Sequence, residues 1–393
     1  MSYMRPGTFL ALAFFPAISF AIAPVFAIAA EPSSQPAGNV LAEFQIEHWG
    51  EPITIPVVWG GKPACFVLDT NASVTVLNAA DFPSLEPFGK NASVGTSGGQ
   101  RAMPMFRPPD LHVGPFSLAD AGHVFRLDLT DLRAMIGRPV IGFLGVSALK
   151  GSVVQVDFDE RKVRFLRPDN QPHPEWGDSL LMQLNAEHNP AVHLSIGGVE
   201  RSLGIDTASN GSIDLPTEAF NRLPDLASQT VLSISSLTAN GTVKLRVVRL
   251  PEVELAGSRY RGLICKETKH SSGTLGLEFL ERHLATLDFP GNRLYLKPGK
   301  EFDHPSEASM SGIHAGRVRD QLVAQVVDAG SPAYEAGVRP GDVLVDLNGK
   351  PAGDYDMPDV RDLMHAGEGK EMTVTFRHGD SQQTVTFKLR RAI

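Results

Sequence analysis

The stretches FVLDT (66–70) and LGIDT (203–207) decide the fold of this chain of 393 residues. Each is an apolar run typical of a buried β-strand, and each ends in the dipeptide Asp-Thr. A single Asp-Thr pair indicates no more than a turn at a strand end, because both side chains often bond the local backbone there. Two pairs in equivalent positions of a repeat would indicate a shared site.

The residues downstream of the two stretches also match in type, order and spacing. GFLG (142–145) matches GTLG (273–276), VDF (156–158) matches LDF (287–289), and KVRF (162–165) matches RLYL (293–296). One offset of 131 residues aligns this block without a gap. A unit of this size predicts two copies of one small domain rather than a solenoid, whose units run to about 20–50 residues.

Each copy is predicted to be mostly β, because frequent glycine (37) and proline (29) favour short strands and tight turns. Residues 153–158 and 163–165 are typical of a hairpin, and the pattern recurs around residues 290–292. A helical turn or two is expected at 146–150 and 277–283. The predicted domains are a signal peptide at 1–29, repeat halves at 40–168 and 178–298, and a C-terminal domain at 308–393, with proline-containing linkers between them.

The first residues have the pattern of an export signal. Arg5 precedes an apolar stretch at 8–30, and AIA at 27–29 supplies the small residues of a cleavage site. An uncleaved membrane anchor is the alternative, which Pro16 and Pro24 disfavour by interrupting the stretch. We expect an exported protein that is periplasmic, secreted or anchored by an uncleaved signal, with membrane contact only in the last case.

Composition limits the partners and cofactors. Hydrophobic residues make up 42% of the chain and charged residues 20%, enough for ordinary cores, and a net charge of −8 argues against nucleic acid as a partner. The 12 histidines form no His-Glu-x-x-His helix and two cysteines are too few for a zinc finger, so neither metal nor another cofactor is expected. Cys65 and Cys265 could form a disulfide in an exported protein, or be two small buried residues.

Two Asp-Thr turns in tandem suit one kind of chemistry. Two carboxylates about 3 Å apart cannot both ionise, so they share one proton. The ionised member can remove a proton from water while the protonated member donates to a peptide carbonyl oxygen. The sequence therefore predicts Asp69 and Asp206 as a catalytic pair that acts on a polypeptide substrate.

The sequence around these residues resembles a known family. Asp69-Thr70-Asn71-Ala72-Ser73 is similar to the Asp-Thr-Gly-Ala-Ser turn of retropepsin-like aspartic peptidases, and the apolar glycine blocks resemble the family's second motif. The resemblance covers about residues 40–298 and implies a mostly β fold of two half-domains related by a pseudo-two-fold axis. It implies that Asp69 and Asp206 are catalytic, and that Thr70 and Thr207 interlock beneath them through hydroxyl-to-backbone hydrogen bonds.

The family also closes a hairpin flap over its substrate. Stretches with glycine lie between each Asp-Thr turn and its glycine block, at 94–100 and 235–242. Flaps exclude water and add strand-like hydrogen bonds to an extended peptide. The substrate-binding residues that this implies are Gly95, Thr96, Ser97, Gly98 and Gly99 in the first half and Ala239, Asn240 and Gly241 in the second.

Two departures from the family leave a second function open. Asn71 and Ala208 stand where the family has glycine, which allows backbone angles and close approaches that a side chain resists. An aspartic-type endopeptidase is the first prediction. The alternative is a catalytically inactive pseudo-peptidase that binds peptides or serves as a scaffold.

The segment 308–393 resembles a bacterial-type PDZ domain, an α+β fold. SPAYEAGVRPGDVL (331–344) carries the resemblance, and Asn348-Gly349 is a hairpin turn signal. PDZ domains bind a C-terminal carboxylate on backbone N–H groups and add the peptide as a strand. The matching loop contains Gly312, Ile313 and His314, although the family prefers an apolar residue at the last position.

One further motif is discounted. Residues 95–99 fit the Gly-x-Ser-x-Gly pattern of serine hydrolases, but that motif needs a strand before it and a helix after it. Here it lies in a glycine-rich, hairpin-like stretch followed by prolines.

Overall fold

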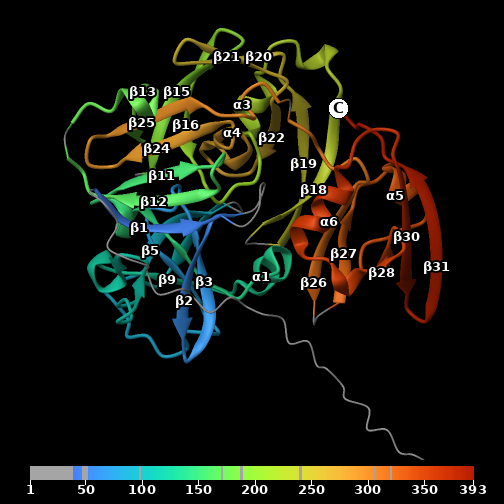
Figure 1. Ribbon diagram of the computed structural model, residues 1–393, viewed down its shortest axis with the longest axis horizontal. Helices are drawn as coiled ribbons and strands as arrows, with labels where there is room; N and C mark the ends of the chain where they lie inside the picture. The colour runs from blue at the N-terminus through green and yellow to red at the C-terminus, as the bar shows by residue number, and fades with distance from the viewer. Residues whose placement is uncertain are drawn as a thin grey trace, which may run out of the picture.

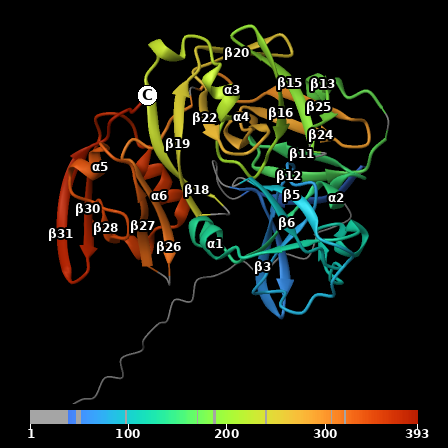
Figure 2. The same ribbon diagram turned by 180° about the vertical axis from the view of Figure 1, so that it is seen from behind.

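The computed structural model describes residues 39–46, 52–96, 99–169, 171–185, 189–238, 241–304, 306–318 and 321–393. These residues form a mostly β protein with short helices (Figures 1 and 2). No helix among them has the length and apolar character needed to cross a bilayer. The signal peptide predicted at 1–29 lies outside the described residues.

A six-stranded antiparallel sheet joins the two copies of the repeat. Its order is β1 (Val40–Gln45), β12 (Lys162–Leu166), β11 (Val153–Asp157), β24 (His283–Asp288), β25 (Arg293–Pro298) and β13 (Asp178–Leu181). In the central pair, β11 and β24, Gln155 lies opposite Thr286 and donates a 3.1 Å hydrogen bond to its hydroxyl. These two residues are 131 positions apart, which is the offset that aligns the two copies in the sequence.

Two further sheets carry the Asp-Thr stretches. The first has the order β2 (Thr54–Trp59), β3 (Lys62–Leu68), β10 (Val140–Leu144), β4 (Val76–Asn78) and β9 (Phe125–Leu127). The second, larger sheet has the order β18 (Val231–Thr238), β19 (Gly241–Arg249), β22 (Ile264–Thr268), β17 (Ile213–Pro216), β23 (Gly273–Leu275), β16 (Val199–Ile205), β15 (Pro190–Ile196), β20 (Glu252–Leu255) and β21 (Ser258–Arg261), with β14 (Gln183–Leu184) beside β15. In both sheets the strand before Asp-Thr, β3 or β16, pairs in parallel with the strand of the glycine block, β10 or β23.

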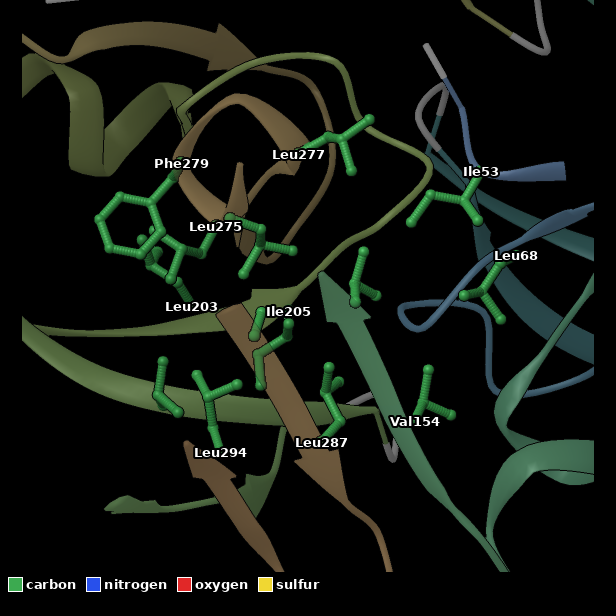
Figure 3. Packing of buried hydrophobic residues seen from close by; sticks show 14 of the residues in the cluster. Ile53, Leu68, Val154, Leu203, Ile205, Leu275, Leu277, Phe279, Leu287 and Leu294 are labelled. Atoms are coloured by element: carbon green, nitrogen blue, oxygen red, sulfur yellow. The ribbon is translucent and has the colours of Figure 1, made fainter. Parts of the chain in front are cut away.

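One apolar cluster spans both copies of the repeat. Its members include Leu68 and Ile205, which precede the two aspartates and are fully buried. Figure 3 shows these two side chains among Ile53, Val154, Leu203, Leu275, Leu277, Phe279, Leu287 and Leu294. Burial of the strand ends against a common core fixes the backbone from which each Asp-Thr turn projects.

Most of the local predictions for the repeat are confirmed. Helices α2 (Val146–Leu149) and α4 (Leu277–Leu280) follow the glycine blocks, and the predicted hairpins are β11–β12 and β24–β25. The first copy adds the two-stranded sheets β5–β6 (Ala92–Thr96, Gly99–Met103) and β7–β8 (His112–Val113, Phe116–Ser117), and helix α1 (Thr130–Ile136). The second copy adds α3 (Thr217–Asn221). Short 3-10 turns occur at Leu118–Ala121, Pro174–Trp176, Leu226–Ser228 and Ala352–Asp354.

The C-terminal segment forms its own core. Its sheet has the order β26 (Ile313–Val318), β27 (Gln321–Val327), β28 (Val343–Leu347), β30 (Glu371–His378) and β31 (Ser381–Lys388), with β29 (Lys350–Pro351) beside β28. Helices α5 (Pro332–Glu335) and α6 (Met357–Met364) complete it. This segment lies beside the repeat, where α1 contacts the edge strand β26 and β18 contacts β27 (Figures 1 and 2).

Two regions add detail that the sequence left open. Trp176, in the stretch expected to be a linker, is buried, with its ring centroid 3.6 Å from that of His173. The end of this linker is therefore fixed by the buried side chain of Trp176. Cys65 and Cys265 are both buried and no disulfide joins them, so the second of the two interpretations of the cysteines applies.

The second glycine of each block lies against the Asp turn. A Cβ at Gly145 would lie 2.7 Å from Ala72 O, and one at Gly276 only 2.2 Å from Gly211 O. The next residues donate backbone hydrogen bonds into the same turns, from Val146 N to Ala72 O and from Leu277 N to Ser209 O. The glycines therefore permit the close approach of the two segments.

We predict that Gly276→Ala lowers the free energy of unfolding by about 1–3 kcal/mol, because a methyl group there meets backbone that cannot move away cheaply. Gly151→Ala is the matched control, since nothing lies within 4 Å of a Cβ there, and it should change stability by less than about 0.5 kcal/mol. Urea unfolding measures both. Equal effects of the two substitutions would contradict the close approach.

Candidate active site

Each aspartate is held at a strand end in the same way. Asp69 N donates to Leu144 O at 3.0 Å, and Asp206 N donates to Leu275 O at 3.0 Å. In each turn one carboxylate oxygen accepts two backbone N–H groups. Asp69 Oδ1 accepts from Asn71 N at 3.0 Å and Ala72 N at 2.9 Å, and Asp206 Oδ1 accepts from Ala208 N at 2.9 Å and Ser209 N at 3.0 Å. The two turns therefore share one hydrogen-bond pattern.

The two turns are joined by reciprocal threonine contacts. The hydroxyl of Thr70 donates to Ile205 O at 2.6 Å and accepts from Thr207 N at 3.2 Å. The hydroxyl of Thr207 donates to Leu68 O at 2.7 Å and accepts from Thr70 N at 3.2 Å. Both threonines are fully buried, so all four bonds lie away from water. This is the interlocking arrangement that the resemblance implied for Thr70 and Thr207.

The two carboxylates lie in one site. Asn71 connects them, because its backbone N–H donates to Asp69 while its side-chain Nδ2 lies 3.4 Å from Asp206 Oδ2. Burial, together with the negative charge of Asp206, raises the pKa of Asp69 to about 8. Burial also raises the pKa of Asp206. Two close carboxyl groups with raised pKa values are suited to sharing a proton near neutral pH.

The sequence did not reveal a third buried acid beside this pair. Asp214 on β17 forms an ion pair with Lys266 on β22, with Lys266 Nζ 3.2 Å from Asp214 Oδ2. Burial raises the pKa of Asp214, and its charge adds to the raised pKa of Asp206. In the sequence, Asp214 stands between the apolar residues Ile213 and Leu215, which suggests a partly buried acid. Nothing in the sequence indicates that its partner is Lys266.

Hairpins occur where flaps were expected. Strand β5 pairs with β6, and β18 pairs with β19 from Val231↔Val248 to Thr238↔Gly241. These hairpins contain the backbone of four of the predicted substrate-binding residues, Gly95, Thr96, Gly99 and Gly241. The other four, Ser97, Gly98, Ala239 and Asn240, lie outside the described residues.

The loop expected to bind a carboxylate in the C-terminal domain uses its own donors internally. Gly312 N donates to Ser309 Oγ at 3.2 Å, and Ile313 N donates to Ser311 Oγ at 3.0 Å. His314 Nε2 lies 2.9 Å from Asp328 Oδ2. A peptide carboxylate would have to displace these bonds, and α1 already contacts the adjacent edge strand β26.

We predict that Thr70→Val lowers the free energy of unfolding by about 2–4 kcal/mol. The substitution keeps the shape of the side chain but leaves Ile205 O and Thr207 N buried without a partner. The control is Thr373→Val, whose hydroxyl contacts Thr386 on an exposed sheet face and should matter by less than about 0.5 kcal/mol. Chemical unfolding of both variants measures the difference, and a Thr70→Val protein as stable as the control would contradict it.

Comparisons with a family model and with solved structures both give matches. The family model described as PDZ domain matches residues 323–378, which lie within the predicted C-terminal domain. Among solved structures, the chain is similar to a retropepsin-like aspartic protease from Rickettsia conorii, at 22% sequence identity over 30% of this chain and 98% of that chain, with a TM-score of 0.26. The comparison with curated proteins found no match. The expected PDZ domain thus has a counterpart among known families.

Proposed function

We propose that this protein is an aspartic-type endopeptidase in which Asp69 and Asp206 of one chain form the catalytic pair. The observation that carries the proposal is the reciprocal bonding of Thr70 and Thr207, which fixes the two Asp turns relative to each other. A turn that served only to end a strand would not need a buried hydroxyl that bonds the other turn.

The proposed catalytic unit is built from two tandem halves. The 131-residue offset in sequence, the matching Asp69 and Asp206 contacts, and the β11–β24 register that pairs Gln155 with Thr286 all favour this arrangement. Strand β13 extends the common sheet on the side of the second half, and β1 extends it on the side of the first. Because one chain contributes all six strands of this sheet, it supplies both Asp69 and Asp206 without a second chain.

The proposed reaction is hydrolysis of a peptide bond by water. The ionised carboxylate removes a proton from the water as its oxygen attacks the scissile carbonyl carbon, and the protonated carboxyl donates to the carbonyl oxygen. No residue forms a covalent intermediate. The hairpins β5–β6 and β18–β19 would cover an extended polypeptide, and we propose that the signal at 1–29 directs the protein out of the cytoplasm.

We predict that Asp69→Asn and Asp206→Asn each lower kcat/KM for peptide cleavage by about 10³-fold or more, because each removes one half of the proton transfer. The matched control is Asp288→Asn, at a hairpin end where its Oδ1 accepts from Gly291 N and an amide oxygen can do the same. It should retain activity within about 2-fold, because a surface substitution away from buried contacts usually changes stability by no more than about 0.5 kcal/mol.

Cleavage of a mixed peptide library, followed by mass spectrometry, gives the measurement and the specificity together. An active Asp206→Asn protein would contradict a catalytic site shared by Asp69 and Asp206. Folded wild-type protein that bound peptides without cutting any would instead favour the binding function that Asn71 and Ala208 leave open.

We also predict a bell-shaped dependence of kcat/KM on pH. Activity is lost at low pH where both carboxyls are protonated, and it is lost again as pH rises through the raised pKa of Asp69, about 8. The active range therefore covers the acid side of neutral and reaches neutral pH. Initial rates measured from about pH 3 to 9 test this, and a single rising limb with no fall at high pH would speak against a shared proton.

A further inference from the structure

The two Asp turns differ at the position that faces the opposite carboxylate. Asn71 follows Thr70 in the first turn, and Ala208 follows Thr207 in the second. Asn71 Nδ2 lies 3.4 Å from Asp206 Oδ2, whereas the methyl side chain of Ala208 has no hydrogen to donate to Asp69. Asp206 thus has a side-chain donor in addition to its two backbone donors, and the other turn offers Asp69 no counterpart.

The packing around the two turns differs in the same way as the side chains at positions 71 and 208. A Cβ at Gly204 would lie 2.3 Å from Asn71 Oδ1, so the missing side chain at 204 makes room for the carboxamide. The equivalent position in the first copy is Val67, which is fully buried. Asn71 therefore faces a glycine, while Ala208 packs against the cluster of Cys65, Val67, Ile136 and Val140.

We propose that Asn71 is a positioning residue that makes the pair asymmetric, so that Asp206 is the ionised general base and Asp69 keeps the shared proton as the general acid. The inference rests on the proposed function and deepens it. An N–H donor favours the ionised form of the carboxylate that accepts it, and only the first turn supplies one from a side chain.

Two other acids lie near Asp206. Asp69 faces it from the opposite turn, and Asp214 on β17, which pairs with Lys266 on β22 at 3.2 Å, raises the pKa of Asp206 and so opposes the effect of Asn71. Burial is the largest cause of the raised pKa of both members of the pair. Asn71 lowers the pKa of Asp206, whereas the charge of Asp206 raises the pKa of Asp69.

The assignment fixes the path of each proton. Asp206 takes a proton from water as the new C–O bond forms, and Asp69 gives its proton to the carbonyl oxygen, which yields a neutral tetrahedral diol. On breakdown Asp206 passes its proton to the leaving nitrogen as the C–N bond breaks, and Asp69 regains a proton from a diol hydroxyl. The pair ends in its starting state.

The test is a carboxyl ¹³C NMR titration of the full chain labelled at aspartate Cγ, with Asp69→Asn and Asp206→Asn used to assign the two signals. We expect Asp206 to ionise first in the wild-type protein. Asn71→Ala removes the donor, so the lower of the two pKa values should rise by roughly 0.5–1 unit, a modest shift because the contact is long. Asn210→Ala, at an exposed position of the second turn, is the control and should leave both titrations unchanged.

A second variant reaches the same contact from the other side. Gly204→Ala displaces the carboxamide of Asn71, so it should reproduce the shift, and the double variant Asn71→Ala with Gly204→Ala should add nothing further. Ionisation of Asp69 before Asp206, or unchanged titrations in both single variants, would overturn the proposal.

Cleavage assays separate this proposal from the proposed function. If the protein is a peptidase, the acid limb of its pH profile should move to higher pH in Asn71→Ala by the same amount as the NMR titration. If the wild-type protein cleaves nothing, the titration still decides which carboxylate Asn71 favours. Expected NMR shifts without cleavage would support the role of Asn71 in the pair while removing the peptidase.

Discussion

The four hydrogen bonds that Thr70 and Thr207 make to each other and to the opposite strand ends are the contact on which the site depends. Each threonine bonds backbone of the opposite turn, so neither Asp turn can shift without breaking bonds to the other. Buried donors and acceptors that lose their partners cost about 1–3 kcal/mol each, which makes the arrangement strongly preferred over a displaced one. The common sheet and the common apolar core support these turns from behind.

Sequence periodicity predicted the parts of this architecture that are local or repeated. The hairpins β11–β12 and β24–β25 and the short helices after the glycine blocks follow from alternation, turn residues and glycine. Residues brought together by topology were harder to predict. The ion pair of Asp214 with Lys266 joins strands whose pairing no local pattern specifies. Helix α6 was not foreseen either, although Met357, Val360 and Met364 are buried and recur at helical spacing. The resemblance to a family indicated Thr70 and Thr207, but not the contact of Asn71 with Asp206, because the family has glycine there.

The packing around Asn71 and Ala208 explains how the turns accommodate residues other than the glycine of the family pattern. A side chain at position 71 is accommodated because position 204 has none, and the small Ala208 lies against a cluster that a larger residue would disturb. Both carboxylates keep their two backbone donors despite the substitutions. The altered turns are therefore compatible with the proposed catalytic pair, and in this proposal they make its two members different.

The C-terminal PDZ domain is part of the same assembly of elements rather than an independent appendage. It contacts α1 of the first copy through β26 and β18 of the second copy through β27. Arg249 of β19 adds hydrogen bonds to Ser306 O at 2.8 Å and to Ile393 O at 3.0 Å. Both strands of the second hairpin thereby contact the PDZ domain. A movement of the hairpin would therefore disturb its contacts with that domain.

The central claim is that one chain supplies both members of the pair, and mixing two inactive variants tests it most directly. Asp69→Asn and Asp206→Asn chains are combined in equal amounts, refolded together, and assayed for peptide cleavage beside the wild-type protein. We expect cleavage by the wild-type protein and none by the mixture, because each chain carries its own defective pair. Recovery of activity in the mixture would show that the site forms between two chains, and would contradict the account.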